Sequence, residues 1–168
     1  DVEAGDTSKK ELFWSDAAEI TFKKNGLRGN IWDHAVQFRD ELLKTAFAPD
    51  SGFEATYHFT IEGAVPSSLF AVVERADLYA ITCNGKPVSA PEGSWWLDRQ
   101  FGKMDITPAA RVGENRLRIV AKPMTVFHEL EAAHLVGDFA VKPAAKGFVV
   151  TPPAPLGLGA WTVQGMPQ

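Results

Sequence analysis

The sequence lacks several features that define broad classes of protein. Its single cysteine, Cys83, excludes an intramolecular disulfide, and we expect it to be a small packed hydrophobic residue. No apolar run approaches the roughly 20 residues that a membrane-spanning helix requires. The formal net charge is -4, the isoelectric point is near 5.6, and no basic stripe is present. Because phosphate contacts dominate nucleic-acid affinity, we expect neither a nucleic-acid nor a membrane partner.

The remaining composition is that of one ordinary folded domain. Hydrophobic residues make up 45% and charged residues 23% of the 168 residues, so wholesale disorder is not expected. The chain is long enough for one substantial core. It begins at Asp1 without a methionine or signal peptide and stops within a Gly-rich stretch. We therefore expect a piece of a longer protein.

Most of the chain consists of short segments with the alternation of β-strands. Residues 53–62 alternate apolar and polar side chains with a period of two, which predicts a strand with one wet face. Further short segments follow with turn residues between them. Many short strands without alternating helices indicate an all-β fold, an antiparallel β-sandwich. The predicted strands are 69–73, 78–83, 86–88, 95–97, 101–106, 116–120, 133–136, 139–142 and 148–151.

The segment from 72 to 120 organises this pattern. Asn84-Gly85 readily adopts the positive φ angles of a two-residue hairpin turn, and Gly113-Glu114-Asn115 breaks the chain before another strand. Between them lie Trp95 and Trp96. Adjacent strand residues point to opposite faces, so we expect one indole in the core and one available to a partner.

The N-terminal third has a different pattern. Residues 1–10 are polar and expected to be mobile, and residues 11–22 could begin a strand. Residues 31–48 carry apolar side chains at helical spacing behind Asn30, a potential N-cap, which predicts a short amphipathic helix, with a turn and a strand as the alternative. We assign residues 1–51 to an N-terminal extension partly packed on the sandwich, and residues 52–168 to the sandwich domain.

Catalytic and metal-binding motifs are poorly represented. His128 and His134 flank Glu129 and Glu131, but they lie six residues apart, whereas two zinc ligands on one helical face lie four apart. No nucleophile elbow, phosphate-binding loop or dinucleotide fingerprint is present. Paired carboxylates could hydrolyse a glycoside only if they faced each other across a cleft, which spacing does not show. We predict no catalytic residues, no metal centre and no cofactor, with structural calcium as an alternative at turn acids: Asp77, Asp98 and Asp138.

The tryptophans are the better functional signal. A sugar presents a face of C–H groups to an aromatic ring and a rim of hydroxyls to carboxylates, amides and guanidinium groups. The run from Trp95 and Trp96 to Asp98 and Arg99 has that mixture. The alternative is that these large aromatics are core residues. The predicted ligand-binding residues are Trp95, Trp96, Asp98, Arg99, Trp32 and His128, whereas Glu74-Arg75 is interpreted as an ion pair between strands.

Several short motifs resemble a known family when they are taken in order. Residues 80–88 with Asn-Gly-Lys, then Asp-Ile-Thr at 105–107 and Gly-Glu-Asn at 113–115, resemble the sugar-binding jelly-roll domain of family 2 glycoside hydrolases. Glu-Arg-Ala at 74–76, the tryptophan run at 95–98 and Leu-Val-Gly-Asp-Phe at 135–139 resemble the galactose-binding-like domains of bacterial alpha-L-rhamnosidase-type enzymes. The resemblance covers roughly residues 53 to 165. It implies a jelly-roll fold that lacks a strand at its C-terminus, because such domains continue beyond a tail like residues 159–165.

This resemblance implies a function without catalysis. Such domains accompany a separate catalytic barrel, which a chain of this length does not contain. We therefore expect a carbohydrate-binding or accessory module from a larger, secreted or periplasmic polysaccharide-degrading enzyme of bacterial type. Its expected partners are a polysaccharide or oligosaccharide and the catalytic domain of the same polypeptide. The alternatives are a structural module that packs against the barrel without binding sugar, and a small standalone hydrolase.

Overall fold

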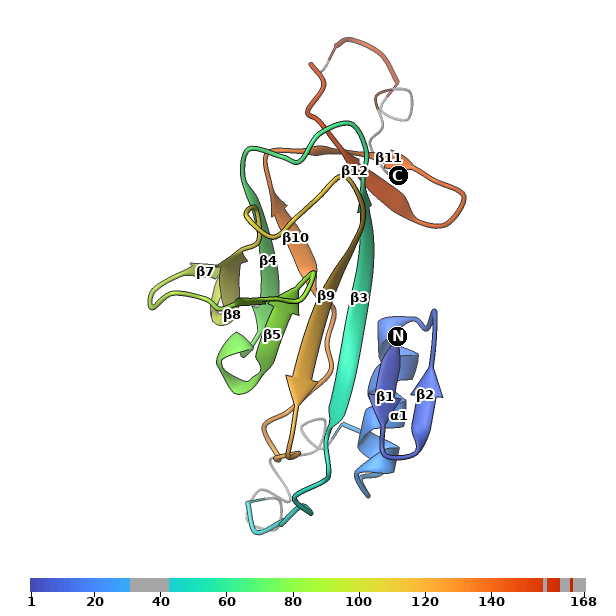
Figure 1. Ribbon diagram of the computed structural model, residues 1–168, viewed down its shortest axis with the longest axis vertical. Coiled ribbons are helices and arrows are strands. Elements are labelled where there is room, and N and C mark those ends of the chain that lie inside the picture. The colour runs from blue at the N-terminus through green and yellow to red at the C-terminus, as the bar shows by residue number, and fades with distance from the viewer. Residues whose placement is uncertain (31–42, 156, 161–163, 165–168) are drawn as a thin grey trace.

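The protein is a sandwich of two β-sheets, seen in a computed structural model that describes residues 1–30, 43–155, 157–160 and 164. Sheet A has the strand order β11-β12-β3-β9-β5-β6, with β1 and β2 attached beside β3, and sheet B has the order β10-β4-β8-β7 (Figure 1). Every strand pair is antiparallel except β12 with β3, which meet in parallel at Val150 and Ile61. The predicted all-β class and antiparallel sandwich are confirmed.

The elements follow one another in short steps along the chain. The helices are α1 (Trp14–Lys24) and the 3₁₀ helix η2 (Ala76–Leu78). The strands are β1 (Val2–Ala4), β2 (Thr7–Lys9), β3 (Phe53–Ile61), β4 (Leu69–Glu74), β5 (Ala80–Cys83), β6 (Lys86–Val88), β7 (Trp95–Trp96), β8 (Asp98–Asp105), β9 (Gly113–Ala121), β10 (His134–Gly137), β11 (Ala140–Pro143) and β12 (Phe148–Thr151).

The chain crosses repeatedly between the two sheets. β3 in sheet A is followed by β4 in sheet B, then by the β5–β6 hairpin in sheet A and the β7–β8 hairpin in sheet B. β9, β10 and the β11–β12 hairpin continue the same alternation. Sequence neighbours are therefore often on opposite layers, and the central pair of sheet A joins β3 to β9, from Phe53 with Ala121 to Ile61 with Gly113.

The core lies between the sheets and follows from strand alternation. On β9, Leu117, Ile119 and Ala121 are buried, and Arg116 and Arg118, which alternate with them, face solvent. On β4 and β8, Ala71 and Met104 are fully buried and belong to the same core cluster. Removing these apolar faces from water supplies the main stabilising free energy of the sandwich.

The predicted strands agree closely with the observed ones. All ten strands expected after residue 52 are present, with ends shifted by at most a few residues. Asn84 and Gly85 have φ angles of 49° and 80°, which confirms the predicted turn. Cys83 is fully buried, as expected for a packed hydrophobic residue.

Predictions for the N-terminal third were less successful. Residues 11–22 were expected to begin a strand, but α1 occupies Trp14–Lys24 and buries Ala17, Ala18 and Phe22. Residues 1–10 form the β1–β2 hairpin, and β1 pairs with β3. The helix predicted over 31–48 lies mostly outside the described residues, and its described part, 43–48, has a turn and no helix.

The N-terminal segment is attached to one end of sheet A. Val2 pairs with Ala55, and Val2, Ala4 and Phe22 belong to the same buried cluster as Phe53. Figure 1 shows β1, β2 and α1 grouped beside the lower part of β3. Among the residues that the structure describes, no helix has the length and apolar character needed to span a membrane.

Candidate functional site

The tryptophan pair forms the short strand β7 at the edge of sheet B. Trp95 pairs with Gly102 and Trp96 with Asp98, with a register shift between them. The chain reverses at Leu97, whose φ of 64° lies in the left-handed region. Asp98 supports the reversal because its Oδ1 accepts the Gln100 N–H at 2.8 Å. The hairpin projects from the sandwich in Figure 1.

The two indoles lie in different surroundings. Trp95 is 48% exposed. Trp96 is partly buried, and its ring centroid lies 6.0 Å from that of His134, which is also 6.4 Å from Phe101. Since Ala71 and Met104 point into the core, the alternating residues of β4 and β8 face outward, and Trp96 lies with Phe101 on that outer face. Neither indole enters the core, which differs from the expectation that one would.

A hollow of about 380 Å³ lies beside Trp95, and we call it the Trp95 hollow. Trp95 and Arg99, two of the predicted ligand-binding residues, both line it. Tyr79 and Gln100 also belong to its lining. Its lining is Ala76, Asp77, Tyr79, Ser89, Ala90, Pro91, Gly93, Ser94, Trp95, Arg99, Gln100 and Gly102.

A second hollow of about 270 Å³ adjoins the first, because Tyr79 and Gln100 line both. The exposed ring of Phe127 lies at this second hollow. We call the two together the loop groove. An aromatic ring is thus present in each half of the groove, and the second half is lined by Glu74, Arg75, Tyr79, Gln100, Phe127, Glu129 and Glu131.

The η2 corner is held between the two halves of the groove. The Arg75 guanidinium donates to both carboxylate oxygens of Asp77, with Nε–Oδ1 and Nη2–Oδ2 distances of 3.0 Å. The interpretation of Glu74-Arg75 as an ion pair between strands is wrong for Arg75, because its planar guanidinium makes a bidentate contact with Asp77 in the same corner. The Arg75 N–H donates to the Gln100 carbonyl at 2.8 Å, which joins η2 to β8.

Tyr79 and His128 support the groove from beneath. The Tyr79 hydroxyl donates to the Glu129 carbonyl at 2.6 Å and accepts the Glu129 N–H at 3.0 Å. Burial raises the pKa of Tyr79 to about 12, so the hydroxyl stays protonated. The Tyr79 ring centroid lies 5.2 Å from that of His128. These contacts position the segment that carries Phe127.

His128 is a buried structural residue. Its side chain is 5% exposed, Nδ1 accepts the Thr125 N–H at 2.9 Å, and Nε2 lies 3.0 Å from the Leu78 carbonyl. Because Nδ1 is an acceptor, the hydrogen is on Nε2 and the ring is neutral. Desolvation lowers its pKa. The prediction that His128 contacts a ligand is corrected, since both ring nitrogens are used within the protein.

The other predicted residues are distributed differently. Asp98 is exposed at the hairpin tip and does not line the loop groove. Trp32 lies outside the described residues. Tyr79 and Gln100 were missed. Tyr79 approaches Trp95 only through the fold, whereas Gln100 directly follows Arg99 on the same hairpin and was not singled out. A signal for Tyr79 was available in its position directly after a turn, where a large aromatic residue at a strand end often borders a loop.

The acids considered for calcium each have protein partners. Asp77 pairs with Arg75, Asp98 accepts the Gln100 N–H, and Asp138 Oδ2 accepts the Ser67 hydroxyl at 3.3 Å. In the described part of the chain, no group of three or more histidine, cysteine or acidic side chains is arranged to hold a metal ion.

Comparisons with protein-family models, with curated protein sequences and with solved structures give no match. The interpretation of the loop groove therefore depends on its own geometry.

Proposed function

We propose that the protein is a non-catalytic carbohydrate-binding module and that the loop groove holds the sugar. The observation that carries this proposal is the half-exposed indole of Trp95 at a hollow whose lining mixes apolar residues with the polar side chains of Asp77, Arg99 and Gln100. A concave site with an aromatic wall and a few convergent polar side chains is the usual form of a small-ligand site. The indole would stack on the C–H face of one sugar unit.

Polar groups in the Trp95 hollow match the rim of a sugar. The Arg99 guanidinium and the Gln100 amide can donate to hydroxyl or ring oxygens, and the Asp77 carboxylate can accept from hydroxyls. Phe127 lies in the adjoining hollow and offers a second apolar surface. The ligand that fits this arrangement is an oligosaccharide of more than one unit.

The arrangement of the chain supports the finer fold assignment. Strands that alternate between two antiparallel sheets are what a jelly roll requires, and the resemblance to galactose-binding-like domains carries the same expectation. On this basis the chain is a module of a larger polysaccharide-degrading glycoside hydrolase, secreted or periplasmic. The chemistry of the parent enzyme would belong to another domain.

Trp95→Ala tests the proposal directly. We expect affinity electrophoresis against a panel of plant and algal polysaccharides to identify a ligand that retards the wild type. Loss of the stacking surface should weaken that binding about tenfold, the equivalent of about 1.4 kcal/mol. Trp96→Ala is the matched control, since it removes the same side chain from the outer face of sheet B and should leave the affinity unchanged.

Three outcomes contradict the proposal. If no polysaccharide retards the wild type, the proposal that the protein binds sugar is contradicted. Equal retardation of the wild type and Trp95→Ala places any sugar outside the loop groove. Release of reducing sugar by the purified protein contradicts the absence of catalysis.

The outer face of sheet B favours a second candidate function. Trp96 and Phe101 lie there on either side of His134, Phe70 is a further partly buried aromatic residue of this face, and the Lys103 ammonium lies 4.1 Å from the Phe70 ring centroid. Such a surface suits packing against the catalytic domain of the same polypeptide. In that case Trp96→Ala would lower the melting temperature of the longer polypeptide more than that of the isolated module.

A further inference from the structure

A separate hollow lies on the outer face of sheet A and is lined by a group of basic side chains. Its volume is about 550 Å³, larger than either half of the loop groove. It combines three arginines with one acidic side chain, that of Asp1. The lining is Asp1, Thr56, His58, Thr82, Asn84, Gly85, Arg111, Arg116 and Arg118. We call it the arginine hollow.

Strand register explains why these side chains meet. Arg118 pairs with Thr56 on β3 and with Thr82 on β5, and Arg116 pairs with His58. Paired residues of neighbouring strands project from the same face of a sheet. Because Leu117 and Ile119 of β9 point into the core, both arginines and their paired residues point away from it. The sheet therefore forms the floor of the hollow.

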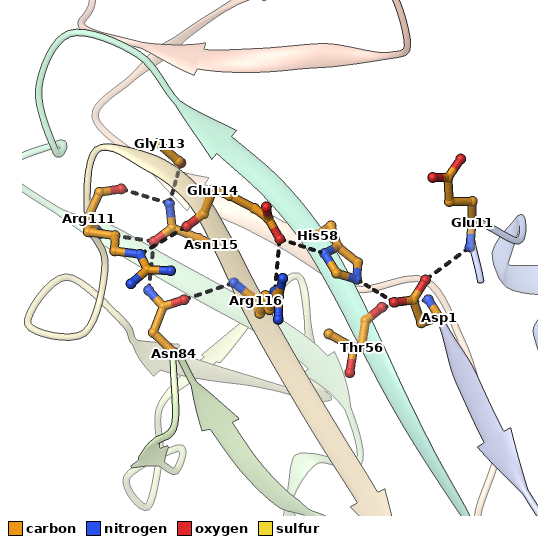
Figure 2. Close-up of polar contacts among 10 residues, drawn as sticks. All are labelled: Asp1, Glu11, Thr56, His58, Asn84, Arg111, Gly113, Glu114, Asn115 and Arg116. Atoms are coloured by element: carbon orange, nitrogen blue, oxygen red, sulfur yellow. Dashed lines mark hydrogen bonds and ion pairs between the residues drawn. The ribbon is translucent and has the colours of Figure 1, made fainter. Parts of the chain in front are cut away.

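A buried amide network fixes the end of the hollow formed by the loops, as Figure 2 shows. Asn115 is fully buried, and its Oδ1 accepts from the Arg111 N–H at 2.9 Å and from Asn84 Nδ2 at 2.8 Å. Its Nδ2 donates to the Arg111 carbonyl at 2.7 Å. The Asn84 Oδ1 accepts the Arg116 N–H at 3.0 Å. The backbones of Arg111 and Arg116 are thus held by the same pair of asparagines.

The guanidinium groups keep donor capacity for a ligand. Arg111 donates from Nε to the Glu114 carbonyl at 3.1 Å, and Arg116 donates from Nε to Glu114 Oε1 at 2.8 Å. Arg118 donates from Nε and Nη2 to Glu54. Among the described residues, the terminal nitrogens of Arg111 and Arg116 have no protein acceptor, so both forks can receive an oxyanion.

The lining of the arginine hollow carries more arginines than carboxylates, and the partners of two of these arginines, Glu114 and Glu54, lie outside the lining. Three guanidinium groups and one side-chain carboxylate line the hollow, in a chain whose net charge is -4. Arg111 pairs with no carboxylate among the residues that the structure describes. Neighbouring guanidinium groups held on a rigid sheet select planar or tetrahedral oxyanions and provide little for a neutral ligand.

We propose that the arginine hollow is a second binding site and that it takes an acidic saccharide whose carboxylate or sulfate groups contact Arg111 and Arg116. Threonine and asparagine side chains in the lining would contact the sugar hydroxyls. The hollow has room for two or three sugar units in place of a single small ion. This inference goes beyond the proposed function and does not depend on the loop groove.

Nucleic acid is the less suitable polyanion. Proteins that bind single strands stack bases on aromatic side chains, and the lining of the arginine hollow has no aromatic residue other than His58. Duplex binding draws on a broad basic surface that releases many counterions, which a chain of net charge -4 with one basic hollow does not provide. An oligonucleotide is therefore a competitor in the test.

Titration calorimetry with the full chain at low ionic strength tests this site. The probes are a trimeric to hexameric galacturonate, a sulfated dextran oligomer and an uncharged dextran oligomer. Binding of either acidic oligomer supports the proposal and identifies the preferred oxyanion, and no binding of uncharged dextran is expected at this hollow. Arg111→Gln and the double variant Arg116→Gln/Arg118→Gln should each weaken acidic binding about tenfold or more. Added salt should weaken it further.

Two variants provide the controls. Lys44→Gln/Lys103→Gln removes the same charge as the double arginine variant from two lysines that do not line the arginine hollow, and should keep the affinity of the wild type. Trp95→Ala should also keep it, which separates failure of this site from failure of the loop groove. The circular dichroism spectrum of each variant checks that it is folded.

The proposal is overturned if neither acidic oligomer binds or if the arginine variants bind as well as the charge-matched control. It is also overturned if inorganic sulfate binds as tightly as the oligomers, since the sugar then contributes nothing. Tighter binding of a single-stranded or duplex oligonucleotide than of both acidic saccharides would assign the hollow to nucleic acid instead.

Discussion

At the scale of single residues, the loop groove is held in shape by His128, whose side chain does not line it. His128 is packed against Tyr79, and its two ring nitrogens contact the Thr125 N–H and the Leu78 carbonyl. Together they join the segment before Phe127 to the η2 corner. Buried polar groups whose hydrogen bonds are all formed restrict a loop to one conformation. Loss of one of these bonds leaves a buried polar group without a partner and greatly lowers the free energy of unfolding.

His128 should make the stability of the fold depend on pH. Desolvation lowers the pKa of His128 in the folded protein below the ordinary histidine value of about 6.5, so the unfolded chain binds more protons from about neutral pH downward. The contribution of this residue is therefore complete above its unfolded pKa and is lost as the pH falls towards its folded pKa. Urea unfolding at pH 7.5 and 5.5 should show a lower free energy of unfolding at pH 5.5.

The variant His128→Asn isolates this effect. Its difference in the free energy of unfolding between the two pH values should be smaller than that of the wild type, since one titrating group is removed. An unchanged difference would show that other groups are responsible. Protonation would also weaken the Thr125 N–H bond to Nδ1, so sugar binding in the loop groove is expected to weaken at the same pH.

At the scale of elements, the strands were predictable and the first helix was not. Period-two alternation and turn dipeptides locate β3 and the β5–β6 hairpin because each feature is local. The helix α1 begins after Phe13, which makes no side-chain capping bond, so the usual start signal is missing. Its buried Ala17, Ala18 and Phe22 fit one helical face, and that spacing was the available clue.

Sequence reasoning could identify those residues of the candidate site that lie close together along the chain. Trp95 and Arg99 lie four residues apart on one hairpin, and both line the Trp95 hollow. Tyr79 and Arg75 come from the preceding corner and join the groove through β4 and β8 pairing, which no short motif encodes. His128 was assigned to the ligand because its burial beneath Tyr79 depends on the tertiary fold.

The join between β10 and β4 depends on a close backbone approach. A Cβ atom at Gly137 would lie 2.2 Å from the Ser68 carbonyl oxygen, and the next residue, Asp138, donates its N–H to that same oxygen at 3.1 Å. Gly137→Ala should therefore separate the strands and lower the free energy of unfolding by about 3 kcal/mol. Urea denaturation measures this loss.

Gly29→Ala is the matched control, because an added Cβ there meets no atom within 4 Å. It should change the free energy of unfolding by less than about 0.5 kcal/mol. Equal effects of the two substitutions would show that the Ser68 contact does not constrain β10.

At the scale of the whole molecule, the N-terminal segment and the sandwich share buried surface. Val2 and Phe22 lie in one core cluster with Phe53, and β1 covers part of the β3 edge. The sequence placed a boundary near residue 51 because the alternating pattern starts there. A change in sequence pattern marks where the strands of the sandwich begin. It carries no information on which apolar faces of the N-terminal segment and the sandwich are buried together.

Differential scanning calorimetry can test this shared core. The full chain should unfold in one transition because its buried cluster is continuous. A chain of residues 52–168 should melt about 10 °C lower, since Phe53 and Ala55 lose their cover. Two transitions in the full chain, one of them matching the shorter chain, would instead define two independent units.

The pairing of β3 with β9 also has a consequence for how the protein forms. Phe53 pairs with Ala121 and Ile61 with Gly113, while β4, β5 and β8, which lie between them in sequence, go to both layers. On the ribosome, β3 emerges well before the partner that completes its central ladder. Contacts between residues so far apart in the sequence make folding slow, because the chain loses conformational entropy in closing the loop before the hydrogen bonds between β3 and β9 form. The apolar face of β3 therefore stays exposed to solvent during synthesis, and a chaperone can bind it at that stage.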